Sequence, residues 1–191
     1  MPLERRMKLI ELADRYGVPI IEDDPYGQLR YEGDDIPSVE ILDSRVREQN
    51  GTYTGNVIYL STFSKILAPG IRLAWVVAPD TVIRKLAIAK QGTDLNTSMF
   101  NQVVAHEVGQ HGFIDRHILV MREVYRERRN AMLDSLEEHM PEGVTWTHPQ
   151  GGLFLWVRLP KNLDSTEMLP GVIEENVAYV PGEFFHPDGS G

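Results

Sequence analysis

Apolar residues recur at helical spacing in several stretches of the chain. In the stretch 3–16, Pro2 suits the first turn and Gly17 suits the C-terminal cap, which predicts an amphipathic helix. The same periodicity predicts helices over residues 80–90, 98–110, 113–140 and 166–175, and a short one around 38–47. We expect Asp80 to be the N-cap of the helix that follows it.

Short runs of β-branched, aromatic and aliphatic residues mark the expected strands. They cover residues 18–21, 57–60, 73–77, 144–147, 153–158 and 177–180. The polar stretch 34–55, which contains Asn50-Gly51, is expected to be a surface excursion. Before residue 113 strands alternate with helices, which is typical of an α/β domain.

A change of texture follows the long helix and indicates a second domain. After Pro141 the elements are short and typical of an α+β arrangement. We therefore expect residues 1–125 to be part of a large α/β domain with a mainly parallel sheet. Residues 126–191 are expected to be part of a smaller α+β domain, and the helix 113–140 to bridge the two.

Composition and charge exclude several classes of function. The net charge of −9 argues against a nucleic-acid partner, for which a basic surface is expected. The chain has no cysteine, which excludes disulfides and cysteine-bound metals. No metal site is expected from histidines either, because His106 and His111 are five residues apart rather than four. No apolar run approaches the roughly 20 residues that cross a bilayer, so a cytoplasmic location without membrane contact is the expectation.

A lysine lies between two of the predicted strands, in an unusual setting. The strand 57–60 is followed by the hydroxyls of Thr62 and Ser64, then by Lys65, and Arg72 precedes the strand 73–77. Hydroxyl and guanidinium donors suit a phosphate group. The lysine is the candidate for covalent chemistry.

Polar groups also gather where the strand 18–21 ends, in Glu22-Asp23-Asp24-Pro25-Tyr26. In open α/β sheets ligands bind at the carboxyl ends of strands. Pyridoxal 5′-phosphate uses a lysine, an acid, a phenol and phosphate donors together. Taken one at a time, each of these residues is more often part of a solvated turn, a strand cap or packing.

The segment 62–72, Thr-Phe-Ser-Lys-Ile-Leu-Ala-Pro-Gly-Ile-Arg, closely resembles the Schiff-base segment of fold-type I pyridoxal-phosphate-dependent aminotransferases of class I/II. Among the subgroups, the chain is most similar to the 2-aminoadipate (LysN-type) aminotransferases. The resemblance extends over nearly all 191 residues. Further matching stretches, in order, are 22–31, 90–98, 151–156 and 176–182.

The resemblance implies a role for each site residue. Lys65 is implied to form the Schiff base with the cofactor and to shuttle the proton. Asp23 is implied to pair with the pyridine nitrogen and Tyr26 to reach the ring oxygen, with Asp24 as the alternative acid. The implied phosphate ligands are Thr62, Ser64 and Arg72. The implied partners are an amino acid, a 2-oxo acid and a second copy of the chain.

The resemblance is also incomplete. This chain has about half the family's ordinary length, and the segments that stack on the ring and grip the substrate carboxylate are expected to lie outside it. We therefore expect a fragment that is a poor transaminase by itself. One alternative is the aminotransferase-like effector domain of a transcription regulator, which the upstream sequence would reveal. Another is a non-catalytic, oligomerising fragment.

Overall fold

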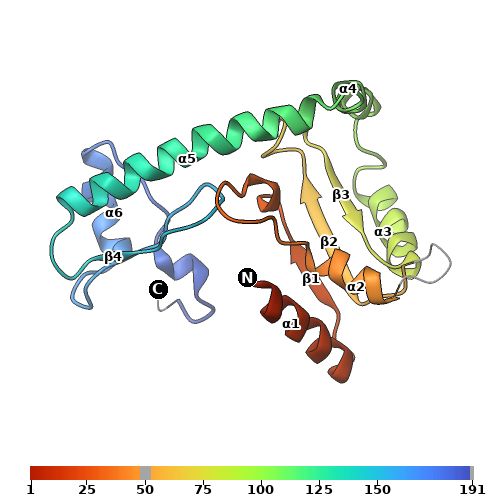
Figure 1. The fold of residues 1–191 in the computed structure, drawn as a ribbon, viewed down its shortest axis with the longest axis horizontal. Helices are drawn as coiled ribbons and strands as arrows, with labels where there is room; N and C mark the ends of the chain where they lie inside the picture. Colours follow the sequence, from red (N-terminus) through yellow and green to blue (C-terminus); the bar gives the residue numbers. More distant parts are fainter. Residues whose placement is uncertain (48–52, 190–191) are drawn as a thin grey trace. The chain divides into compact units, whose positions relative to one another are not determined.

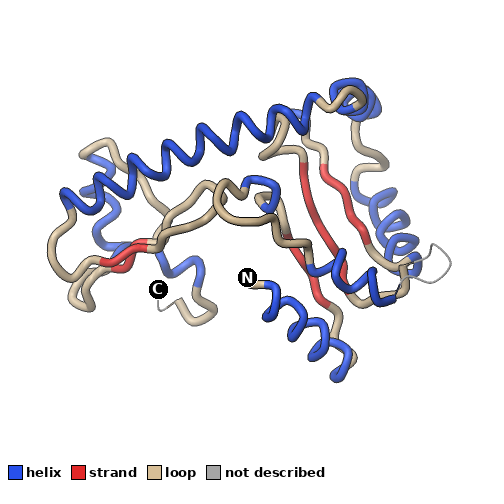
Figure 2. The backbone as a smooth tube through the Cα atoms, viewed as in Figure 1, coloured by secondary structure: helices blue, strands red, loops and turns tan. Residues whose placement is uncertain are grey.

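A computed structural model describes residues 1–47 and 53–189, so the expected Asn50-Gly51 turn lies outside the described residues. The chain divides into two compact units. Unit 1 comprises Met1–Arg129 and Gln150–Leu153, and unit 2 comprises Asn130–Pro149 and Phe154–Gly191. Helices and strands together make up both units, in agreement with the predicted α/β class (Figure 2).

Unit 1 is built on a three-stranded sheet with β2 in the middle (Figure 1). Its strands are β1 (Ile20–Asp23), β2 (Val57–Thr62) and β3 (Ala74–Val77). β1 and β2 are parallel, with Asp23 opposite Leu60, whereas β2 and β3 are antiparallel, with Thr62 opposite Ala74. All three strands were expected, although β1 begins and ends two residues later than the stretch 18–21.

One face of this sheet is covered by α1 (Leu3–Tyr16) and α2 (Val39–Arg47). Ile10 from α1 and Leu42 from α2 pack against Val57 of β2, which is 1% exposed. Glu22 of β1 accepts hydrogen bonds from the first amides of α2, at 2.9 and 3.1 Å, which suits a carboxylate at a helix N-terminus. The expectation that 34–55 is a surface excursion was therefore wrong for α2, because its apolar side faces the sheet.

Three further helices follow β3: α3 (Asp80–Thr93), α4 (Met99–Gly109) and α5 (Phe113–His139). Asp80 was wrongly predicted to be an N-cap. The cap position is Pro79, without a side-chain bond, and Asp80 is the first helical residue. Ser98 caps α4, since its hydroxyl accepts from the Asn101 amide at 3.4 Å.

The first part of α5 lies over the segment that follows β1. Ile118 packs with Leu29 and Ile66 in a second core cluster. Arg126 donates to the Tyr31 carbonyl at 2.9 and 3.1 Å, and Arg129 pairs with Glu32. These two arginines therefore fasten the helix to the loop.

Unit 2 contains short elements. Its strands β4 (Thr145–Trp146) and β5 (Val157–Arg158) are antiparallel, and α6 (Ser165–Glu174) continues through Pro170 (Figure 2). Asp164 caps α6 by accepting from two amides, at 2.7 and 3.1 Å. The stretch 177–180 was wrongly predicted to be a strand, because among the described residues no neighbouring strand pairs with it.

None of the helices in the described part of the chain is both long enough and apolar enough to cross a membrane.

Candidate functional site

Lys65 lies in the turn that leaves β2. The turn is closed by hydrogen bonds from the Leu67 and Ala68 amides to the Phe63 carbonyl, at 2.8 and 3.1 Å. Ile66, 4% exposed, anchors the turn in the second core cluster. Lys65 itself is only half-buried, and its Nζ lies 5.8 Å from the centroid of the Tyr26 ring. The structure therefore brings the lysine and the tyrosine of the predicted site together.

Two hydroxyls lie next to this turn. Thr62 Oγ1 is 2.9 Å from Ser64 Oγ and 2.8 Å from the Leu73 carbonyl oxygen. It also accepts a hydrogen bond from the Ser64 amide at 3.0 Å. Both side chains are half-buried. Thr62 and Ser64 thus form a compact pair of hydroxyls at the carboxyl end of β2.

Arg72 follows a short 3₁₀ turn, Pro69–Ile71, and adopts the left-handed conformation with φ 53° and ψ 44°. For a residue with a Cβ this conformation costs roughly 1–2 kcal/mol. Strained backbone of this kind occurs often at functional sites, where it positions a side chain. The Arg72 side chain is exposed, as is most of β3 after it, and it donates to the Pro69 carbonyl at 3.1 Å.

The two neighbouring acids point in different directions. Alternation along β1 places Asp23 on the same face as Thr62, and Asp23 is exposed. Asp24 faces the other way, with its Oδ2 3.3 Å from the Tyr59 hydroxyl and its carboxylate packed over Gly27. A Cβ on residue 27 would collide with that carboxylate. Of the two acids, Asp23 shares a face of the sheet with Thr62, whereas Asp24 is held toward Tyr59.

Sequence reasoning missed the residues that hold Asp24 in place. The buried Ser61 hydroxyl donates to the Asp24 carbonyl at 2.8 Å, and the Asp24 amide donates to the Leu60 carbonyl at 2.9 Å. Burial, with a smaller contribution from Asp24, raises the pKa of the Tyr59 phenol. Side chains alternate between the two faces of a strand, so extending the predicted strand 57–60 by one residue places Ser61 on the same face as Tyr59. This signal could have predicted that both residues lie near Asp24.

Gly151 makes a close backbone approach to the loop that follows Tyr26. It pairs with Arg30 in a short antiparallel bridge, and a Cβ at this position would lie 2.7 Å from the Arg30 Cα. The Gly152 amide donates to the Leu29 carbonyl at 3.0 Å. Only glycine fits at residue 151 without moving the loop that follows Tyr26.

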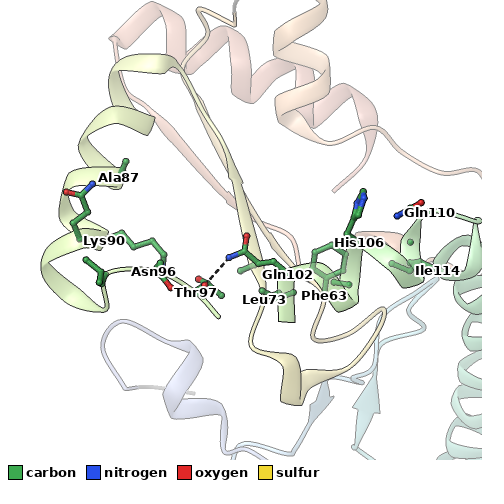
Figure 3. A pocket seen from close by; sticks show the side chains of 15 residues that line it. Phe63, Leu73, Ala87, Lys90, Asn96, Thr97, Gln102, His106, Gln110 and Ile114 are labelled. Carbon is green, nitrogen blue, oxygen red and sulfur yellow. Dashed lines mark hydrogen bonds between the residues drawn. The ribbon is translucent and has the colours of Figure 1, made fainter. Parts of the chain in front are cut away.

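A hollow of about 890 Å³ opens beside β3, between α3, α4 and the start of α5 (Figure 3). Its lining includes apolar side chains such as Leu73 and Ile114 and polar ones such as His106 and Gln102. Of the predicted site residues, none is among its lining residues. The hollow is therefore separate from the constellation around Lys65.

Comparison with known proteins decides the family. The family described as aminotransferase class I and II matches residues 1–191. The chain belongs to this family.

Relatives of this aminotransferase chain fall into two groups. The aromatic-amino-acid aminotransferase 1 of Thermococcus litoralis is 48% identical over 182 residues, which is 95% of this chain and 42% of that protein. The crystal structure of LysN, the α-aminoadipate aminotransferase of Thermus thermophilus, in complex with N-(5′-phosphopyridoxyl)-L-leucine, has a TM-score of 0.91 and 39% identity, over 100% of this chain and 47% of that one. An HTH-type transcriptional regulator of Bacillus subtilis, YisV, is 33% identical over 97% of this chain and 36% of its own length.

The predicted resemblance to the class I/II aminotransferases, including the LysN-type subgroup, is confirmed by these matches. The aminotransferase chain spans under half the length of the relatives reported above.

Proposed function

We propose that this chain carries the lysine side of the active site of an aminotransferase that uses pyridoxal 5′-phosphate. The whole protein would transfer an amino group reversibly from an amino acid to a 2-oxo acid. The observation that carries the proposal is the placement of Lys65 Nζ 5.8 Å from the Tyr26 ring, in a turn flanked by the Thr62–Ser64 pair. The relatives named as aminotransferases support it.

The donors around Lys65 fit this cofactor chemically. A phosphate needs hydroxyl and guanidinium donors, which Thr62, Ser64 and Arg72 offer at the carboxyl end of β2 and in front of β3. A protonated ring nitrogen needs a carboxylate, which Asp23 offers. A ring oxygen needs a donor such as the Tyr26 phenol. When bound, the cofactor supplies an aldehyde carbon that joins to an amine and a ring that accepts electrons.

The roles of the chain's own groups follow from their positions. Lys65 would hold the cofactor through its amine and would then move a proton at Nζ. Asp23 would keep the ring nitrogen protonated, and the orientation of Asp24 toward Tyr59 supports Asp23 over its neighbour. Tyr26, packed in the second core cluster, would orient the ring from the side of Lys65.

The domain assignment is part of the same proposal. Residues 1–125 would belong to the large cofactor-binding domain and residues 126–191 to the small one, with α5 contributing to both. The division of the chain into compact units at Arg129 supports a boundary in this helix. A homo-oligomer, on the family resemblance, and a cytoplasmic location, as expected from the sequence, complete the proposal. The isolated chain is expected to be a poor transaminase, since its relatives are more than twice as long.

Borohydride trapping tests the attachment. The chain is incubated with pyridoxal 5′-phosphate, reduced, digested and mapped by mass spectrometry. We expect the phosphopyridoxyl group on Lys65, with Lys8, Lys85, Lys90 and Lys161 as internal controls in the same digest. A group spread evenly over the lysines, or found on none of them, contradicts the proposal.

The similarity to the regulator YisV supports a second candidate, a non-catalytic effector domain that binds the same cofactor. Trapping at Lys65 is common to both candidates, so it does not separate them. Conversion of a 2-oxo acid by the whole protein favours the enzyme. A basic winged-helix segment encoded upstream, together with absent amino transfer, favours the regulator.

A further inference from the structure

Arg72 is exposed and strained, yet its backbone is fixed on both sides. On one side, Asn101 of α4 donates from Nδ2 to the Ile71 carbonyl at 3.0 Å. On the other side, the Leu73 carbonyl accepts from the Phe63 amide at 3.1 Å and lies 2.8 Å from Thr62 Oγ1. Arg72, with its left-handed φ of 53°, thus lies between two residues whose carbonyls are each fixed by a hydrogen bond.

The contact from Asn101 acts on the conformation of Arg72 directly. The Ile71 carbonyl belongs to the peptide unit that ends in the Arg72 amide, and φ is the rotation that follows that amide. A donor fixed on this carbonyl therefore opposes rotation of the peptide toward a commoner conformation. Without that donor, the left-handed conformation of Arg72 loses a constraint that holds it.

Asn101 is itself well placed to serve as a fixed point. It lies in the first turn of α4, where its amide donates to the Ser98 hydroxyl at 3.4 Å. The Gln102 amide donates to the Ser98 carbonyl at 3.1 Å, which closes the same turn. The Asn101 side chain is half-buried, so water competes only partly for the Ile71 carbonyl.

We infer that Asn101 is a positioning residue for phosphate binding, because it holds Arg72 in the left-handed conformation that presents its guanidinium. The inference rests on the proposed function, since it takes Arg72 as a phosphate ligand. It extends the site to α4, a helix that contributes none of the predicted cofactor ligands. Its effect should therefore depend on the phosphate of the ligand and on the presence of Arg72.

The first measurement compares pyridoxal 5′-phosphate with pyridoxal, which lacks the phosphate. Dissociation constants are determined for the wild-type chain, Asn101→Ala and the equally shaped Asn101→Asp, which has no donor for the Ile71 carbonyl. We expect each variant to bind pyridoxal 5′-phosphate about fivefold more weakly, the worth of about one neutral hydrogen bond, and pyridoxal as wild type does. In an Arg72→Ala background, Asn101→Ala should have no further effect.

Gln102→Ala is the matched control. Gln102 is next to Asn101 on α4, and its side-chain Nε2 also donates to a backbone carbonyl, that of Thr97, at 3.0 Å (Figure 3). Its loss should change neither dissociation constant. If Asn101→Ala weakens both ligands equally, or neither, the inference is wrong.

A second measurement needs no cofactor. Trypsin cuts after Arg72 only when this segment opens, and Asn101→Ala should speed that cut about fivefold, with Gln102→Ala unchanged. If the wild-type chain binds neither pyridoxal compound, the proposed function fails, and the cleavage rate alone decides whether Asn101 holds Arg72. An unchanged rate overturns the inference in either case.

Discussion

The two ends of β2 carry polar groups in different surroundings. Near the amino end, Asp43 is 1% exposed and its carboxylate accepts three hydrogen bonds. At the carboxyl end, Lys65 and the Thr62–Ser64 pair are half-buried. Asp43 accepts from Arg47 Nε at 2.7 Å, from the Tyr53 hydroxyl at 2.6 Å and from the Asn56 amide at 3.1 Å. The two ends of one strand thus hold polar groups in opposite ways.

The difference indicates that the Asp43 end of β2 contributes to stability and the Lys65 end to ligand binding. A buried carboxylate is tolerated only when its bonds are made, so the Asp43 cluster contributes to folding and leaves no group for a ligand. At the other end, ammonium, hydroxyl and guanidinium donors remain within reach of solvent. Substitutions at the Asp43 end should therefore change stability, and those at the Lys65 end should change cofactor binding.

The largest expected effect is at Lys65. Lys65→Ala removes the amine that the cofactor would join, so trapping of the phosphopyridoxyl group should disappear from the 62–72 segment. The free energy of unfolding, measured by urea denaturation, should stay within about 0.5 kcal/mol of wild type, because the side chain is outside the core. A large loss of stability would mean that this end of β2 is structural as well.

Asp43→Ala should have the largest effect on stability. It leaves Arg47 and Tyr53 without their shared partner, which should lower the free energy of unfolding by about 3 kcal/mol. Asp80→Ala is the control, because Asp80 is exposed and its pairing with Arg84 is long, at 3.8 Å. Equal urea midpoints for the two variants would remove the contrast between the ends.

Tyr53→Phe sharpens the same contrast through pH. Loss of the hydrogen bond to Asp43 should cost about 1.5–3 kcal/mol at pH 8. Burial, followed by the bond to Asp43, raises the pKa of the Tyr53 phenol above its ordinary 10.0. The unfolded chain therefore loses this proton first, and the stability that Tyr53 contributes falls as the pH rises above 10.

The expected result is that wild type and Tyr53→Phe converge between pH 8 and pH 11 in urea denaturation. A gap that stays constant over this range would show that Tyr53 does not titrate differently in the two states.

Gly27→Ala tests the region between the two ends. A Cβ there would meet the Asp24 carboxylate, which can rotate away only at the loss of its 3.3 Å contact with the Tyr59 hydroxyl, so the substitution should cost about 1 kcal/mol of unfolding free energy. Gly92→Ala, in the open part of α3, should instead stabilise by up to about 1 kcal/mol. Thermal unfolding of both variants checks the opposite signs.

The sequence predicts the helices well, because each has apolar residues at helical spacing, and α1 has the expected bounds, although α3 and α6 bury none of these side chains. It also assigns Lys65 and Tyr26 to one site, since each follows the carboxyl end of a predicted strand, and the structure places Lys65 Nζ 5.8 Å from the Tyr26 ring. It misses the Asp43 cluster, since no periodic pattern in the sequence brings Arg47 and Tyr53 to the same carboxylate. It places a strand at 177–180 because β propensity reports a suitable surface and does not supply a neighbour.

The Thr62 and Ser64 hydroxyls differ in where their hydrogen atoms can go. Each hydroxyl has one hydrogen, yet Thr62 Oγ1 lies within bonding distance of both the Leu73 carbonyl and Ser64 Oγ. A carbonyl can only accept, so the Thr62 hydrogen is best given to Leu73, and Thr62 would donate to a phosphate only by releasing that bond. The Ser64 hydrogen can then turn toward an incoming anion without breaking a bond to the backbone. Two hydroxyls that look equivalent in the sequence thus differ in their hydrogen bonding. Thr62 links β2 to Leu73, just before β3, and the Ser64 hydrogen remains available to a ligand.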